Sequence, residues 1–121
     1  MGVIHSYKEL IVWQKAMDLT TRVYAFTSKF PPEEKFGLSS QMRRCAVSIP
    51  SNIAEGRRRG TEKDYRQFLM IAYGSGAELE TQTEIASRLG YGSVAERKAC
   101  VELTDEIMRI LNKMISQFLR S

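Results

Sequence analysis

The residues that could carry out chemistry in this chain are basic side chains gathered in one short stretch. Five of them lie within ten positions: Arg57, Arg58, Arg59, Lys63 and Arg66. Clustered guanidinium and ammonium groups attract phosphate, so this stretch is a candidate surface for nucleic acid. The same cluster is also typical of a solvated turn, and the sequence leaves both interpretations open.

Residue types needed for catalysis or metal binding do not converge anywhere in the sequence. His5 is the only histidine, and a metal site requires several histidine, cysteine or carboxylate ligands. The run from Gly74 to Gly76 lacks the lysine that ends a phosphate-binding loop, and no histidine is at hand to activate Ser75. The sequence therefore predicts no enzyme, no cofactor and no metal site.

A stripe of polar side chains accompanies the apolar face of the predicted second helix. Its members recur at spacings of three or four: Gln41, Arg44, Ser48, Asn52 and Glu55. Glu78 and Gln82 have the same relation on the next helix. We expect a structural network of hydrogen bonds between helices or subunits, in which Arg44 pairs with a carboxylate such as Glu78. A channel for a ligand or nucleic acid is the alternative.

The two cysteines, Cys45 and Cys100, fall on the apolar faces of predicted helices, with no CxxC spacing and no histidine cluster. Cysteines in such positions usually behave as small buried hydrophobic residues. Disulfide and metal-binding roles are the alternatives.

Hydrophobic periodicity predicts four long helices. Apolar residues recur at spacings of three and four over residues 7–29, 38–58, 62–90 and 94–119. Ser6 with Glu9 and Ser93 with Glu96 have the spacing of capping boxes. Thr61 is a candidate N-cap for the third helix.

Pro50 lies inside the second predicted helix. A proline has no N–H for the carbonyl of Ala46 and should kink the helix. We expect a kinked continuous helix rather than two separate ones, with Ser48, Ser51 and Asn52 satisfying the freed groups.

Two glycines, Gly74 and Gly76, lie inside the third predicted helix, where each costs roughly 1 kcal/mol relative to alanine. We expect them to permit the close approach of a neighbouring helix. A break with a functional loop is the alternative.

Four helices joined by short turns predict an all-α fold, an antiparallel up-down-up-down four-helix bundle. With 121 residues, 43% of them hydrophobic and 26% charged, the chain has the length and composition of one globular domain. No repeat or low-complexity linker divides it, so we expect residues 1–121 to form a single domain.

Targeting segments are not evident in the sequence. No apolar run approaches the roughly 18–20 residues that span a bilayer, and the N-terminus lacks the features of a signal peptide. We therefore expect a cytoplasmic protein that does not bind membranes.

The first predicted helix has a wide apolar face that includes Trp13, Tyr24 and Phe26. A four-helix core buries only about a third to a half of each helix. Surplus apolar surface usually marks an interface, so we expect a homo-oligomer.

Three motifs carry a family resemblance. They are Gln41-Met-Arg-Arg44, Ser48-Ile-Pro-Ser-Asn-Ile-Ala-Glu-Gly56, and Gly74-Ser75 with Glu78-Leu-Glu-Thr-Gln82. In this order, within about residues 7–119, they resemble the bacterial four-helix-bundle family of 23S rRNA-intervening-sequence proteins. The sequence is similar also to the accessory variability determinant of diversity-generating retroelements.

The resemblance implies a bundle that assembles as a ring-shaped homopentamer. It also implies a role for basic surfaces, because the retroelement relatives bind nucleic acid and a reverse transcriptase through them. The basic positions that would correspond here are Arg43, Arg44, Arg57, Arg58 and Arg59.

Together these features predict a non-enzymatic oligomeric bundle that binds RNA or DNA through its basic surface. The net charge of +4 agrees with this interpretation. The rival interpretation is a scaffold whose basic patch binds an acidic protein partner. Salt separates the two, since nucleic-acid binding falls steeply with salt, whereas a partner with a packed apolar anchor survives moderate salt.

Overall fold

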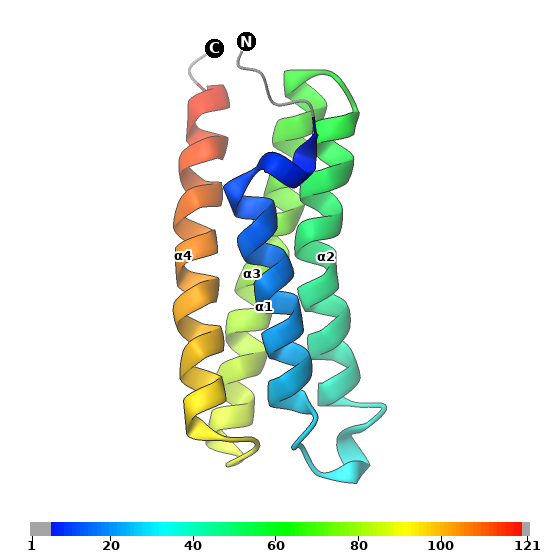
Figure 1. Ribbon diagram of the computed structural model, residues 1–121, viewed down its shortest axis with the longest axis vertical. Helices are drawn as coiled ribbons and strands as arrows, with labels where there is room; N and C mark the ends of the chain where they lie inside the picture. Colours follow the sequence, from blue (N-terminus) through cyan, green and yellow to red (C-terminus); the bar gives the residue numbers. More distant parts are fainter. Residues whose placement is uncertain (1–5, 120–121) are drawn as a thin grey trace.

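Residues 6–119 are described by the computed structural model, and they form four long helices (Figure 1). In chain order the elements are a 3-10 helix η1 (Tyr7–Glu9), α1 (Ile11–Thr27), a 3-10 helix η2 (Pro32–Glu34), α2 (Leu38–Arg58), α3 (Glu62–Arg88) and α4 (Val94–Leu119). This part of the chain contains no strand. The predicted all-α class is confirmed, whereas His5 lies outside the described residues.

Contacts between the helices show how the chain runs through the bundle. Among the described residues, α1 packs against α2 and α4, and α3 packs against the same two helices, so α1 and α3 occupy opposite corners. Consecutive helices run in opposite directions (Figure 1). The turn between α2 and α3 lies at one end of the bundle, and the other two connections lie at the opposite end.

The first helix begins later than the sequence predicts. Ser6 accepts a hydrogen bond from the N–H of Lys8 at 3.1 Å, which closes only the single 3-10 turn of η1. Leu10 is then extended, with φ −72° and ψ 126°, and α1 starts at Ile11. The expectation of one helix over residues 7–29 was therefore wrong at its start, because the predicted cap serves a 3-10 turn.

The second helix is continuous through Pro50. Because proline has no N–H, the carbonyl of Ala46 lacks a donor within its own helix. The hydroxyl of Thr20 on α1 lies 3.2 Å from that carbonyl and 2.8 Å from a carbonyl one turn earlier on α1. We expected Ser48, Ser51 and Asn52 to satisfy the groups freed by the proline. This expectation was wrong for the Ala46 carbonyl, since Asn52 donates to the carbonyl of Ser48 instead. The kink at Pro50 stays a prediction.

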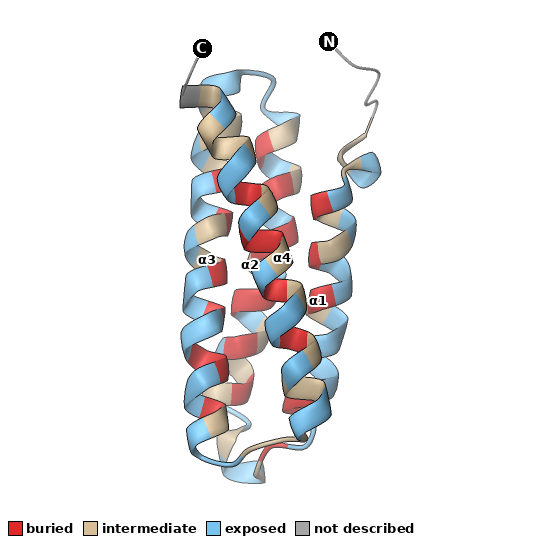
Figure 2. Ribbon diagram, turned by 90° about the vertical axis from the view of Figure 1, so that its left-hand side faces the viewer, coloured by how far each residue is buried: buried red, intermediate tan, exposed pale blue. Residues whose placement is uncertain are grey.

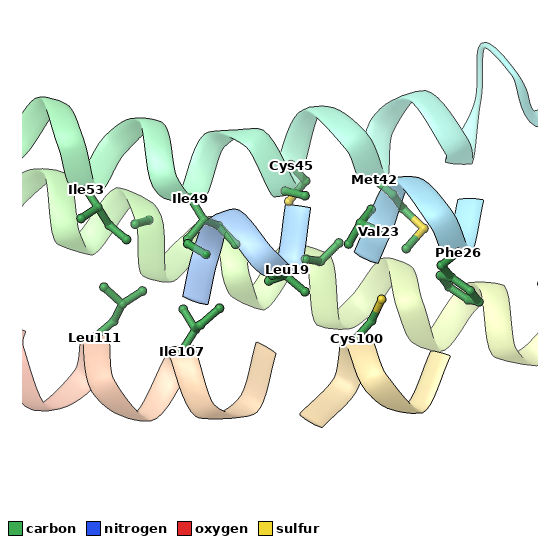
Figure 3. Packing of buried hydrophobic residues seen from close by; sticks show 14 of the residues in the cluster. Leu19, Val23, Phe26, Met42, Cys45, Ile49, Ile53, Cys100, Ile107 and Leu111 are labelled. Atoms are coloured by element: carbon green, nitrogen blue, oxygen red, sulfur yellow. The ribbon is translucent and has the colours of Figure 1, made fainter. Parts of the chain in front are cut away.

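One hydrophobic core runs along the bundle, and the buried residues line the inner sides of the helices (Figure 2). Figure 3 shows Ile49 and Ile53 of α2 pointing toward Ile107 and Leu111 of α4. Phe26 is fully buried in this core. The wide apolar face predicted for the first helix packs against two neighbouring helices, α2 and α4, so Phe26 belongs to the core rather than to surplus surface.

Two glycines bring neighbouring helices close together. A Cβ on Gly56 of α2 would lie 2.6 Å from the Cβ of Phe68 on α3, and a Cβ on Gly76 of α3 would overlap the sulfur of Met108 on α4. Around Gly74, no described atom beyond its chain neighbours and the nearby backbone of its own helix lies within 4 Å of such a Cβ. The expected close approach is therefore confirmed for Gly76 and wrong for Gly74.

Exchanging glycine for alanine at two helical positions should change the free energy of unfolding in opposite directions. Alanine is favoured over glycine by about 1 kcal/mol inside a helix, and Gly74→Ala should gain most of this amount. At Gly56 a methyl group would force α2 and α3 apart, so Gly56→Ala should lose about 1–3 kcal/mol. Urea unfolding followed by circular dichroism measures both. Equal effects of the two changes would contradict the close packing at Gly56.

The contact from Thr20 to Ala46 should stabilise the protein only because Pro50 is present. Thr20→Val should lower the free energy of unfolding by about 1–2 kcal/mol, since a partly buried carbonyl loses its donor. In a Pro50→Ala background the new N–H restores the helical bond, and the same change should cost less. Thr21→Val is a matched control, because Thr21 is exposed and donates within its own helix. An equal cost in both backgrounds would rule out this role for Thr20.

Candidate nucleic-acid surface and polar seam

The five basic residues at the turn between α2 and α3 form what we call the basic corner: Arg57, Arg58, Arg59, Lys63 and Arg66. The chain turns at Gly60, whose φ of +88° lies in the left-handed region that favours glycine. Thr61 then caps α3 by accepting a hydrogen bond from the N–H of Asp64 at 3.2 Å. This short turn brings the end of α2 and the start of α3, with their basic residues, to one end of the bundle.

Two guanidinium groups of the basic corner lie against aromatic rings. Arg58 lies 5.6 Å from the ring centre of Tyr7, and Arg59 lies 5.0 Å from that of Phe68. Arg59 also pairs with Glu55 one turn earlier, with Nη2 and Oε2 2.8 Å apart. Stacking on a ring orients the planar guanidinium. Because Arg58 and Arg59 are exposed, their N–H groups can still reach phosphate oxygens.

The other three members of the basic corner differ in exposure. Lys63 is exposed, whereas Arg57 and Arg66 are half-buried. Nη1 of Arg66 lies 3.2 Å from the sulfur of Met70, and its Nε is buried without an acceptor in the described part of the chain. Burial raises the pKa of the Tyr65 hydroxyl, and the nearby positive charge of Arg57 opposes this rise.

Acidic residues reduce the positive charge of the basic corner. Glu55, Glu62 and Asp64 lie in the same stretch, so residues 55–66 contain five basic and three acidic side chains. The ion pair between Glu55 and Arg59 is exposed and contributes little to stability. The corner is therefore a moderately positive surface that can attract phosphate without a dedicated pocket.

The structure separates Arg43 and Arg44 from the basic corner. Arg43 precedes Arg57 by fourteen residues on the same helix, which is about 21 Å at 1.5 Å per residue. Nε of Arg43 donates to the hydroxyl of Thr27 at 2.8 Å, and its guanidinium lies 4.6 Å from the ring centre of Tyr24. Arg43 thus ties α2 to α1, and the basic residues named from the sequence do not form one continuous surface.

A polar seam runs between α2 and α3, where it includes Cys45, Ser48, Asn52 and Ser75. The hydroxyls of Ser48 and Ser75 lie 2.8 Å apart, and Nδ2 of Asn52 donates to the Ser48 carbonyl and hydroxyl at 2.8 and 3.0 Å. The thiol of Cys45 donates to the Ser75 carbonyl at 2.9 Å. Sequence reasoning missed Ser75 as the α3 partner, although its position between two helical glycines was a signal of close approach.

The seam continues toward Glu78 and Gln82. Nε2 of Gln82 donates to Glu78 at 3.3 Å, while its Oε1 is buried without a donor among the described residues. Gln41 and Arg44 line a hollow of about 310 Å³ together with Glu78. Glu55 takes no part in this network, because it pairs with Arg59.

The expected ion pair between Arg44 and Glu78 does not form within one chain. Both side chains are exposed at the outer edge of the seam, and no ion pair joins them among the residues that the structure describes. The prediction was wrong for the single chain because the two helices share only the inner part of the polar stripe.

The two cysteines are buried free thiols. Burial raises the pKa of the Cys45 thiol to about 12, and the negative charge of Glu78 adds to this rise. Burial raises the pKa of the Cys100 thiol to about 11. Since the thiolate is the reactive form of cysteine, neither thiol is suited to nucleophilic chemistry at neutral pH.

Residues 6–119 offer neither a cluster of metal ligands nor a membrane-spanning helix. No group of three or more His, Cys, Asp or Glu side chains there could hold a metal ion. None of the described helices is both long and apolar enough to cross a membrane.

Four helices around one core, with a basic turn at one end and a polar seam between α2 and α3, define a helical-bundle protein. The family model described as 23S rRNA-intervening sequence protein matches residues 8–113. The chain belongs to this family, which confirms the resemblance seen in its motifs.

A solved structure resembles the whole bundle. It is a crystal structure of a protein with unknown function from the S23 ribosomal protein family of Bacteroides thetaiotaomicron. The two sequences are 25% identical, and the superposition gives a TM-score of 0.79 over 88% of this chain and 96% of the other. No curated protein matches the chain.

Both native thiols should resist alkylation until the bundle unfolds. A rise in pKa from 9.0 to about 12 lowers the thiolate fraction of Cys45 at pH 8 roughly 1000-fold, since each pKa unit is a factor of ten. Asn112→Cys supplies an exposed thiol on α4 for comparison. Iodoacetamide should modify the introduced thiol rapidly and Cys45 only after denaturant is added. Rapid modification of Cys45 in the native protein would contradict its burial.

Proposed function

We propose that this protein is a non-enzymatic, cytoplasmic, oligomeric bundle that binds RNA or DNA through its basic corner. The observation that carries the proposal is the exposure of Arg58, Arg59 and Lys63 at one end of the bundle, with both guanidinium groups oriented by aromatic rings. Such groups contact phosphate oxygens and position a protein on nucleic acid without reading its sequence. The family description, 23S rRNA-intervening sequence protein, favours an RNA partner.

Self-association is the second part of the proposal, and the family resemblance favours a homopentamer. Large apolar side chains are exposed on every long helix, which supports an interface between copies. In a ring whose axis runs along the helices, all basic corners lie at the same end. Several moderately positive corners then act on one nucleic acid, and multivalency raises the affinity without any new contact.

Removing two exposed charges from the basic corner should weaken RNA binding and reduce its salt dependence. The variant Arg59→Gln with Lys63→Gln loses two phosphate-binding groups per copy. The slope of log K against log salt should fall by about 0.7–0.9 for each phosphate contact that is lost. Fluorescence anisotropy with a structured RNA fragment, titrated over a potassium chloride series, measures both effects.

A matched control removes the same charge far from the basic corner. Lys35→Gln with Lys98→Gln changes two exposed lysines near the opposite end of the bundle, and this variant should bind RNA like the wild type. Equal weakening by both variants would show that net charge, rather than the corner, drives binding. A wild-type protein that ignores RNA and DNA at every salt concentration would overturn the proposal and favour a scaffold for an acidic protein.

A further inference from the structure

An apolar groove lies on the outside of the bundle between α1 and α2. Its volume is about 320 Å³, and its lining includes Trp13 and Met17 of α1 with Val47, Pro50 and Ala54 of α2. Met17 and Val47 are each 41% exposed. Exposed apolar surface in a depression of this kind is typical of a site that a partner covers.

An arginine stacked on a tyrosine stands near each end of this groove. Arg58 lies over Tyr7 at the end near the basic corner, and Arg43 lies over Tyr24 toward the opposite end. The two arginines are fifteen positions apart on α2, which corresponds to about 22 Å of helix. The groove has an apolar lining and a positive charge near each end. It is therefore complementary to a partner helix that presents apolar residues interrupted by acidic ones.

Such a helix face exists on the same chain, on the flank of α3 beside α2. Ile71, Ile85 and Leu89 are 46%, 44% and 54% exposed. Glu78 lies seven residues from both isoleucines, so the three side chains share one side of the helix. We call Ile71, Glu78, Ile85 and Leu89 the α3 stripe. Because Glu78 borders the polar seam, the stripe faces outward on the side of the bundle formed by α2 and α3.

The contacts between α2 and α3 show which of their residues lie at the same height, meaning the same position along the long axis of the bundle. Ser48 is level with Ser75, and Gly56 is level with Phe68. Since the two helices are antiparallel, Ile71 is level with residues 52 and 53, between the groove residues Ser51 and Ala54.

The same comparison places Glu78 of the α3 stripe at the height of Arg44, which takes part in no ion pair among the described residues. Glu78 and Cys45 line one hollow, so Glu78 is level with the adjoining Arg43 and Arg44. A rotation about an axis parallel to the helices leaves every height unchanged. In a neighbouring copy related by such a rotation, Ile71 is therefore level with the groove, and Glu78 is level with the arginines.

We propose that the groove between α1 and α2 of one copy receives the α3 stripe of a second copy. Ile71 fills the groove, and Glu78 forms an ion pair with Arg44 of the neighbouring copy. The pair expected from the sequence then forms between copies instead of within one. This inference rests on the self-association in the proposed function and assigns the surfaces that produce it.

The loop before α2 fits the same arrangement. Phe36 is 89% exposed, and its loop lies beside the end of α3, because Tyr91 donates a hydrogen bond to Glu34 at 3.0 Å. Ile85 and Leu89 lie at this end of the bundle. In the neighbouring copy they are level with Phe36, so contact between copies covers these three exposed side chains as well.

The geometry of the two surfaces favours a closed ring. Groove and stripe are different surfaces, so the contact is heterologous and repeats from copy to copy. They lie on adjacent sides of the bundle, which share α2. Faces whose outward directions differ by about 90–110° close a ring after four or five copies, whereas opposite faces would give an open fibre.

Introducing opposite charges on the two proposed surfaces tests whether the groove contacts the α3 stripe. Val47→Lys and Ile71→Glu should each raise the dissociation constant of the assembly at least tenfold, measured by light scattering over a dilution series. The double variant brings the long lysine side chain toward the glutamate, about five residues away along the bundle, and should recover part of the loss. Val101→Lys is the matched control, because Val101 is 50% exposed on α4, away from groove and stripe, and should leave the assembly intact.

Cross-linking gives a second readout that does not depend on destabilising variants. Oxidation of a Ser51→Cys, Ile71→Cys variant should join copies into covalent oligomers up to the full ring. The Ser51→Cys, Met70→Cys variant should not, since residue 70 is turned by about 100° around α3. An intact assembly in the charge variants together with equal cross-linking of both pairs would overturn this interface alone. A wild-type monomer at all concentrations would overturn the proposed self-association and this interface together.

Discussion

The carbonyl of Ala46 has no donor in its own helix, and much of the structure depends on how this deficit is met. The hydroxyl of Thr20 on α1 shares its single proton between that carbonyl, 3.2 Å away, and the carbonyl of Ala16, and this contact joins α1 to α2 beside Pro50. The proline ring, instead of disrupting the bundle, becomes part of the groove in which Trp13 and Met17 lie. A residue that sequence rules treat as a helix breaker therefore sets both the packing of α1 and the shape of the outer surface.

Close packing of α2 against α3 has a second consequence, which concerns polar groups. Gly56 lets the helices approach, and Ser48 and Ser75 meet in the seam. Around Ser48 and Ser75 the narrow seam accommodates small polar side chains, whereas the longer side chains of Arg44 and Glu78 at its edge are exposed. Arg44 and Glu78 are therefore exposed on one chain, where each is available to a neighbouring copy. The same packing that stabilises the bundle thus leaves charged groups for association.

Sequence periodicity could predict the four helices because their ends carry local signals. Thr61 and Ser93 cap α3 and α4 where expected. Local patterns could not show which helix lies opposite a given face. Gly76 meets Met108 whereas Gly74 faces open space, and only the three-dimensional arrangement distinguishes them. For the same reason, the sequence could not show that Arg43 is held by α1 or that the basic residues divide into two groups.

One residue, Arg58, belongs to both the proposed assembly surface and the proposed nucleic-acid surface. Arg58 belongs to the basic corner, and it also stands over Tyr7 at the end of the groove. A neighbouring copy in the groove would contact this guanidinium, so assembly would orient a group that also reaches phosphate. Lys63 and Val47, by contrast, each belong to one surface. Loss of RNA binding through Lys63 in an intact ring, and loss of the ring through Val47, would show that the two functions use separate surfaces joined at Arg58.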